Sequence, residues 1–260
     1  MTSTSAPAGA QAVTRALGLL QCFHDNAGAL SVSELARRMG LSVSTTHRLA
    51  RTLVAADVLE QDEQTARYRI GPLVAELGQL SLHQRGMHRA APELADLSRS
   101  TGATADLAIR GGDHAVILVG GSVNPATGLG LRRPLHSTAL GKVLLAWARP
   151  GEGDLRSLPM PALTDRTITD PVALEEELGR VRERGYALND GESVHGVRTL
   201  AVPVLEATGH VHAALALRST PDVLTDDRLP WFLAHARSCA RALEVLLLPP
   251  QLRHSALPGR

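Results

Sequence analysis

The apolar positions of the first 70 residues change from the period of an α-helix to that of short strands. Val13, Leu17 and Leu20 recur three or four residues apart, which predicts a helix. Further on, 58–61 and 67–70 are strand-like runs separated by the polar segment DEQTA. Two such runs around a short polar segment predict a β-hairpin.

Segment 32–51, VSELARRMGLSVSTTHRLAR, lies between this helix and the hairpin. Ser31 or Ser33 can cap a first helix, and Gly40 can end it in the left-handed conformation. Ala36 is small enough to let a second helix, capped by Ser42, cross closely. These are the steric requirements of a helix-turn-helix. The expected inward residues of the second helix are Val43, Thr46, Leu49 and Leu53.

The outward face of the second helix carries short hydroxyl donors near its start and arginines further along. A recognition helix places its first residues against base edges, while flanking arginines neutralise phosphates. A hairpin that follows such a helix is a wing. The alternative is an ordinary helical hairpin with a solvated face, but spacing, caps and basic residues together favour DNA binding. The predicted DNA contacts are Ser42, Ser44, Thr45, His47, Arg48, Arg51 and Arg67.

The rest of the chain begins with a narrow apolar stripe and continues with strands and helices. Leu73, Leu77 and Leu80 predict a linker helix that packs on a partner subunit, with packing on its own domain as the alternative. An α+β fold, an antiparallel sheet with helices on its faces, fits the order that follows. Helices are expected over 87–100, 139–148, 171–184 and 226–247, and strands over 104–110, 115–120, 129–132, 198–205 and 211–217.

The composition excludes several classes of protein. With 260 residues, 44% hydrophobic and 20% charged, the chain is expected to form about two globular domains. The net charge of +1 says nothing about nucleic acids, because a phosphate-binding footprint is local. Cys22 and Cys239 have no metal-ligand spacing, and no apolar run or N-terminal signal suits a membrane or secretion. We expect a cytoplasmic protein without metal or cofactor, with a disordered tail over 1–11 and a C-terminal tail over 251–260.

Several runs of the sequence resemble the IclR family of bacterial transcription regulators. They are RALGLLQCF, LSVSELARRMGLSVSTTHRLARTL and YRIGPLVAELG in the first part, and PLHSTALGKVLLAW, TDRTITDPVALEEELGRVRERGYALNDGE and GVRTLAVPV in the second. The resemblance extends in order from Ala12 to about Leu248. It implies a winged helix-turn-helix (12–71), a linker helix (72–86) and a GAF- or profilin-like effector-binding domain (87–250). It also implies dimers, often paired into tetramers, and a small organic effector.

The same resemblance implies where the effector binds. In the family the pocket is built from the H-x-x-x-x-G-K loop, the acidic segment after Gly-Tyr and the two strands that follow. This chain has Asn189 where many relatives carry Asp, Thr199 where they carry Cys, and Ala216 and Arg218 where members that bind keto acids carry serines. An inward Arg218 would clamp a carboxylate or phosphate; it could instead face outward or pair with Glu192. The predicted effector contacts are His136, Ser137, Thr138, Ala139, Leu140, Asn189, Asp190, Glu192, Val197, Thr199, Ala216 and Arg218.

Enzyme chemistry is the main rival class. Ser193 and His195 stand two residues apart in GESVHG, which is not the G-x-S-x-G elbow, and the chain contains no H-E-x-x-H, P-loop or G-x-G-x-x-G. His210 and His212 have no third ligand at metal-site spacing. An orphan regulator or interaction module without a ligand is a second rival. We therefore predict a homodimer or tetramer, more often a repressor, that binds a pseudo-palindromic double-stranded operator under the control of an effector.

Overall fold

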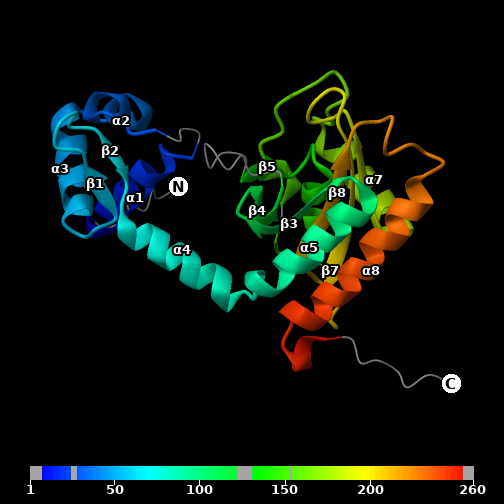
Figure 1. Cartoon of the computed structure of the whole chain (residues 1–260). Helices are drawn as coiled ribbons and strands as arrows, with labels where there is room; N and C mark the ends of the chain where they lie inside the picture. The colour runs from blue at the N-terminus through cyan, green and yellow to red at the C-terminus, as the bar shows by residue number, and fades with distance from the viewer. Residues whose placement is uncertain (1–7, 25–27, 122–130, 153, 254–260) are drawn as a thin grey trace. The chain divides into compact units, whose positions relative to one another are not determined.

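The computed structural model describes residues 8–24, 28–121, 131–152 and 154–253. Contacts divide this part of the chain into two units, one ending at His83 and the other beginning at Gln84. Figure 1 shows the first unit as helices with a small hairpin and the second as a sheet covered by helices. The predicted fold class, a winged helix-turn-helix followed by an α+β domain, is confirmed.

The first unit contains three helices and a two-stranded wing. They are α1 (Ala8–Gln21), α2 (Val32–Met39), α3 (Val43–Val54), β1 (Leu59–Gln61) and β2 (Tyr68–Ile70). The strands are antiparallel. The helix α1 already begins at Ala8, so the expected N-terminal tail is too long by residues 8–11, and residues 1–7 lie outside the described part.

The ends of α2 and α3 follow from their capping residues. Ser31 caps α2: its Oγ accepts from the Glu34 N–H at 3.3 Å, while its own N–H donates to the Glu34 carboxylate at 2.7 Å. Gly40 ends α2 with φ 63°, where a side chain would be strained. Ser42 caps α3 by accepting the Thr45 N–H at 3.2 Å. The sequence predicted Gly40 and Ser42 in these roles and left Ser31 and Ser33 as alternatives.

One predicted core position of α3 is wrong. Val43 is 50% exposed, because it is the first residue of the helix and no neighbour in the described unit covers it. The predicted position Thr46 is fully buried, and so is Ala50, which the sequence did not predict. Ala50 packs with Leu35 and Tyr68, so the wing shares its core with the helices.

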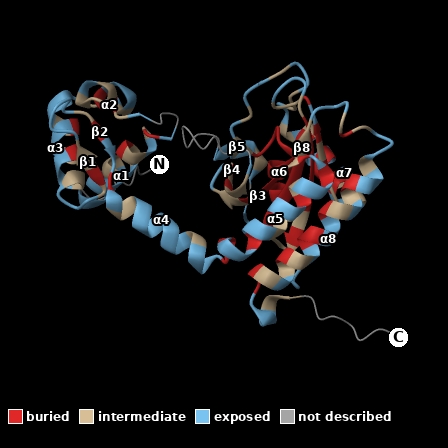
Figure 2. Cartoon of the chain, viewed as in Figure 1, coloured by how far each residue is buried: buried red, intermediate tan, exposed pale blue. Residues whose placement is uncertain are grey.

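The linker helix α4 (Pro72–Gln84) has no buried residue. Figure 2 shows it pale blue over most of its length, in contrast to the helices of the second unit. Leu77 and Leu80 are 53% and 50% exposed. Within the described residues, Leu77 and Leu80 of the predicted apolar stripe are therefore largely uncovered, whereas Leu73 is half-buried.

The second unit is built on a six-stranded antiparallel sheet of order β5-β4-β3-β8-β7-β6. Its strands are β3 (Thr104–Gly111), β4 (His114–Gly120), β5 (Arg132–Pro134), β6 (Ala187–Asp190), β7 (Arg198–Leu205) and β8 (Val211–Ser219). The strand β6 was not predicted, and the expected strand 129–132 overlaps β5 only at Arg132, with residues 129 and 130 outside the described part.

Helices cover both faces of this sheet. They are α5 (Met87–Thr101), α6 (Ala139–Ala146), α7 (Pro171–Arg184) and α8 (Leu229–Leu247), with short 3-10 turns at Leu155–Ser157 and Pro250–Leu252. The second turn extends into the expected C-terminal tail, because residues 251–253 belong to this turn and its end. The tail was therefore expected to begin too early in the chain. Within the described residues, no helix is both long and apolar enough to cross a lipid bilayer.

The two faces of the sheet differ in side-chain size. Along β8, Ala214 and Ala216 face α6, whereas Leu215 and Leu217 belong to the opposite face, because strand side chains alternate. Small side chains let α6 approach the sheet closely. Gly141 allows the same approach at the start of α6: a Cβ there would lie 2.2 Å from the Leu135 carbonyl oxygen.

Candidate functional site

The outward face of α3 presents a polar and basic surface. Ser44, His47, Arg48 and Arg51 are exposed. Thr45 is half-buried, and its Oγ1 accepts from the hydroxyl of Ser42 at 2.9 Å. Short donors therefore stand in the first turn and arginines one and two turns later, which is the arrangement that a helix needs to read a major groove between phosphates.

Arg67 is bound within its own unit. Its Nη2 lies 2.7 Å from Glu34 Oε2, and its Nε donates to the Ala29 carbonyl at 3.0 Å. Arg67 thus ties the wing to the capped start of α2. The other wing arginine, Arg69, forms an ion pair with Glu60. The sequence held no sign of the Arg67–Glu34 pair, because these two residues stand far apart along the chain.

A cavity of about 430 Å³ lies beside α6 in the second unit, and we call it the α6 pocket. Its walls come from the first turn of α6, from all six strands of the sheet and from the segments after β5 and β6. Of the twelve predicted effector contacts, eight line it: Thr138, Ala139, Leu140, Asn189, Val197, Thr199, Ala216 and Arg218.

The other four predicted contacts lie outside this lining. His136 and Ser137 are fully buried, and His136 Nε2 lies 3.0 Å from the Pro161 carbonyl oxygen. Asp190 is exposed beside Arg166. Glu192 turns toward the Lys142 ammonium group. These residues shape the surroundings of the α6 pocket.

Eight further lining residues were missed from the sequence: Asp106, Ile117, Arg132, Arg133, Pro134, Leu163, Ser193 and Val194. Asp106 had left a usable signal, since it interrupts the apolar strand 104–110 and a buried carboxylate needs a partner. It is 2% exposed in the structure. For Arg133, nothing in the local sequence indicates that it faces a cavity.

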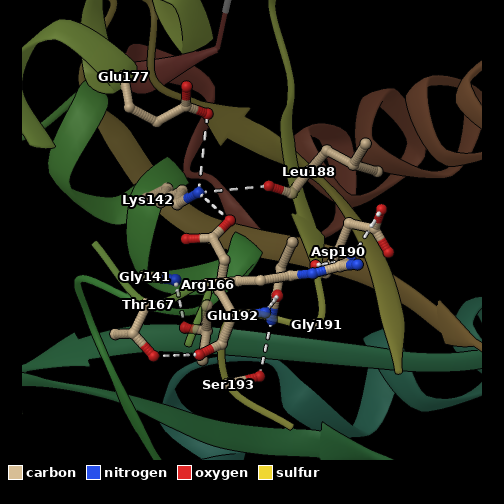
Figure 3. Close-up of polar contacts among 12 residues, drawn as sticks. Gly141, Lys142, Arg166, Thr167, Glu177, Leu188, Asp190, Gly191, Glu192 and Ser193 are labelled. Carbon is tan, nitrogen blue, oxygen red and sulfur yellow. Dashed lines mark hydrogen bonds and ion pairs between the residues drawn. The ribbon is translucent and has the colours of Figure 1, made fainter. Parts of the chain in front are cut away.

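Lys142 is the centre of a buried ionic cluster (Figure 3). Its Nζ lies 2.5 Å from Glu192 Oε1 and 3.7 Å from Glu177 Oε1, and it donates to the Leu188 carbonyl at 3.4 Å. Burial raises the pKa of Glu192 although Lys142 opposes this. Burial also acts on Glu177, but Lys142 and Arg184 outweigh it, so that the pKa of Glu177 is lowered. The cluster holds α6, α7 and the segment after β6 together.

Asn189 connects this cluster to the α6 pocket. Its Oδ1 accepts from the Glu192 N–H at 2.8 Å, and its Nδ2 donates to Ser193 Oγ at 2.7 Å. An ionised aspartate has no N–H to donate. The amide at this position therefore orients Ser193, which lines the pocket, in a way that an aspartate could not.

Ser193 and His195 do not form the nucleophile–base pair that catalysis would need. Ser193 is bonded to Asn189, whereas the imidazole of His195 is 69% exposed and lies 3.6 Å from Asp165. The same part of the chain contains no group of three or more His, Cys, Asp or Glu side chains that would hold a metal ion. The geometry indicates a ligand-binding cavity in one unit and a basic helix in the other.

Models of two protein domains match the chain. Residues 12–63 match the IclR helix-turn-helix domain, and residues 80–245 match the C-terminal domain of the bacterial transcriptional regulator IclR. The chain belongs to the IclR family of bacterial transcriptional regulators. The family predicted from the sequence is thereby confirmed.

Individual relatives agree along nearly the whole chain. The transcriptional regulator BhcR of Paracoccus denitrificans is 34% identical over 248 residues, which cover 93% of this chain and 88% of BhcR. The transcriptional repressor AllR of Escherichia coli K12 is 33% identical, covering 85% of this chain and 84% of AllR. The crystal structure of an IclR homologue from Microbacterium hydrocarbonoxydans with 4-hydroxybenzoate is similar with a TM-score of 0.74 and 26% identity, covering 91% of this chain and 98% of the homologue.

Proposed function

We propose that this IclR-family regulator is a repressor that binds a pseudo-palindromic operator through α3 and responds to a small organic acid. The observation that carries the first half is the exposed outward face of α3, with Arg48 and Arg51 behind the hydroxyl groups of its first turn. Ser42 and Thr45 orient that turn through their own hydrogen bond. The relative AllR is a transcriptional repressor, which supports the repressor assignment.

The α6 pocket supports the second half of the proposal. Its volume of about 430 Å³ lies within the range of small-molecule sites. Three arginines and one aspartate are its charged residues, so its formal charge, 3 − 1, is +2 and favours an anion. The Microbacterium homologue was crystallised with an aromatic acid, 4-hydroxybenzoate. An organic acid is therefore the class of effector that we propose, bound by the lining residues and not by His136, Ser137, Asp190 or Glu192.

The exposed apolar faces of the first unit support a dimer. Leu77 and Leu80 on α4, and Val13 and Leu17 on α1, are each at least half exposed. Burial of such side chains against a second copy would stabilise a dimer and present two α3 helices to two half-sites. We propose that dimers pair further into tetramers and that the protein acts in the cytoplasm, where bacterial operators lie. The regulators among its relatives give no support to an enzyme.

The test is a selection of bound sequences from a random pool of double-stranded DNA, followed by footprinting of the enriched sequence. The proposal predicts an inverted repeat and protection of two half-sites by the full-length protein. Thermal melting against a panel of organic acids then reports on the second half, because a ligand of the native state raises Tm. Selection of no sequence would overturn the DNA-binding assignment. If no acid in the panel raises Tm, the protein would be an orphan regulator that acts without a ligand.

A further inference from the structure

Two guanidinium groups from distant strands reach the α6 pocket from the same face of the sheet. Arg218 follows Ala216 by two residues on β8, so both side chains lie on the α6 face. Arg133 on β5 pairs with Ala115 of β4, which also packs on that face. Both arginines line the pocket. Their meeting is a product of the strand order, which places β4 and β3 between them.

A buried carboxylate lies at the same place. Asp106 on β3 pairs with Ala216 across the sheet, one step of the same face away from Arg218. Gly120 on β4 makes room for it, because a Cβ at Gly120 would lie 2.2 Å from Asp106 Oδ1. Burial lowers the pKa of Arg133, Asp106 opposes this, and repulsion from Arg218 adds to it. Asp106 and Arg218 therefore both lie close enough to act on the charge of Arg133.

Their charges do not balance. Arg133 and Arg218 contribute two positive charges and Asp106 one negative charge, which leaves one positive charge in excess among these three groups, while the third arginine of the lining, Arg132, is exposed. Arg133 Nη1 donates to the Arg132 carbonyl at 3.0 Å, and a guanidinium has five N–H donors in all. One further carboxylate would complete the charge balance with bidentate geometry.

The remaining lining is largely apolar. Ile117, Leu140, Leu163, Val194 and Val197 form its walls, and all of these are aliphatic. The polar group of Asn189 is already engaged with Ser193 and the Glu192 backbone. Such walls favour an apolar ligand body over a sugar-like one, because unpaired hydroxyl groups would lose their hydrogen bonds to water.

We infer that Arg133 and Arg218 together bind the single carboxylate of an apolar organic acid, and that Asp106 is their internal counter-ion, which weakens this binding. The inference rests on the proposed function, since it names the ligand class and the anion subsite of the same pocket. The acid's carboxylate enters beside Asp106 and accepts hydrogen bonds from the two guanidinium groups. Its alkyl or aryl body lies against the aliphatic walls.

The experiment uses matched acids and their neutral amides on the full-length protein: benzoate and benzamide, phenylacetate and phenylacetamide, hexanoate and hexanamide. Calorimetry is expected to show that at least one acid binds and that its amide binds at least tenfold more weakly. Arg133→Gln and Arg218→Gln should each weaken binding of the acid by about tenfold to a hundredfold and leave binding of the amide unchanged. Arg241→Gln, an exposed position on α8, is the matched control and should bind as the wild type.

Asp106→Asn gives a test that misfolding cannot imitate, because the inference predicts a gain. The variant keeps the shape of the side chain and removes its charge, so it should bind the acid several-fold more tightly. Acid binding that is unchanged in both arginine variants, or equal binding of acid and amide, would refute the subsite while the proposed function stands. Weaker binding by Asp106→Asn would refute the counter-ion role. If neither acids nor amides bind, the effector half of the proposed function fails as well.

Discussion

The guanidinium of Arg67 and the carboxylate of Glu34 meet at 2.7 Å, and this ion pair joins the wing to the capped start of α2. Glu34 has two roles at once, because it also accepts from the Ser31 N–H. Hydrogen bonds from Ser31, together with the charge of Arg67, lower the pKa of Glu34. The recognition helix follows α2 directly, so this pair contributes to its placement.

Arg67→Ala is therefore expected to lower the Tm of the first unit modestly while leaving the salt dependence of operator binding as it is. The reason is that the side chain is engaged by Glu34 and Ala29, not by phosphate. Arg69→Ala, which breaks the more exposed pair with Glu60, serves as the control and should change Tm less. A smaller salt slope for Arg67→Ala would show that Arg67 contacts DNA, as the sequence predicted.

Arg48→Ala and Arg51→Ala should each weaken operator binding. Each loses one phosphate contact, so the slope of log K against log salt should become less steep by about 0.9 per arginine. Filter binding or fluorescence anisotropy at several salt concentrations measures this slope. Arg99→Ala, an exposed arginine on α5, removes the same charge far along the chain and should leave the slope unchanged. Wild-type slopes in both α3 variants would show that another surface binds DNA.

The apolar face of α4 gives a prediction about assembly. The double variant Leu77→Glu and Leu80→Glu places like charges on a face that a partner would have to bury, so it should be monomeric at micromolar concentration. Analytical ultracentrifugation checks this, with Val172→Glu on α7, which is 67% exposed, as a control of the same chemical change. A dimer that persists in the double variant would place the interface elsewhere.

Two helical glycines in the second unit are expected to respond in opposite ways to alanine. Gly141→Ala pushes a methyl group to 2.2 Å from the Leu135 carbonyl and should destabilise the protein by roughly 1–3 kcal/mol. Gly179 on α7 has no neighbour within 4 Å of its potential Cβ, so Gly179→Ala should stabilise by up to about 1 kcal/mol. Urea denaturation compares the two. Equal stability of Gly141→Ala and wild type would mean that α6 can move away from Leu135.

What the sequence could predict was local. Gly40 and Ser42 were assigned correctly because a cap depends on residues within one turn. Most strands and helices were found from periodicity, whereas β6 was missed because its four residues are too short for a clear alternation. The prediction that Val43 faces the core was wrong for a related reason. A helical pattern does not show where a neighbouring helix ends, so it does not show which residues that helix covers.

The α6 pocket was only partly predictable. The resemblance supplied Thr138, Asn189 and Arg218 as pocket residues. The other two charged residues of the proposed subsite come from other strands. Asp106 and Arg133 reach the pocket because β3, β4 and β5 lie next to β8, and strand order is set by long-range pairing. Periodicity within a strand contains no information about it. Of the residues that are proposed to determine the ligand, Arg133 therefore became visible only in the folded sheet.

His136 gives a prediction about pH. Its ring is fully buried, with one nitrogen near the Pro161 carbonyl and Nδ1 without a hydrogen-bond partner among the described residues. Burial and, to a smaller extent, Lys142 lower its pKa below 6.5, although the hydrogen bond to Pro161 opposes this. The folded protein thus favours the neutral ring. The resulting stability is complete above pH 6.5 and is lost as the pH falls from there toward the lowered pKa of the folded state.

The Tm of the wild type should consequently fall as the pH is lowered from 7.5 to 5. The Tm of His136→Asn should fall less steeply over the same range, even if it is already lower at pH 7.5. The Tm of His136→Asn will still depend on pH to some extent, because burial also lowers the pKa of His212. His195→Asn is the control: this imidazole is 69% exposed, so its removal should leave the slope as in the wild type. If His136→Asn and wild type lose Tm in parallel, protonation of His136 does not limit stability, and the acid sensitivity belongs to other groups such as His212.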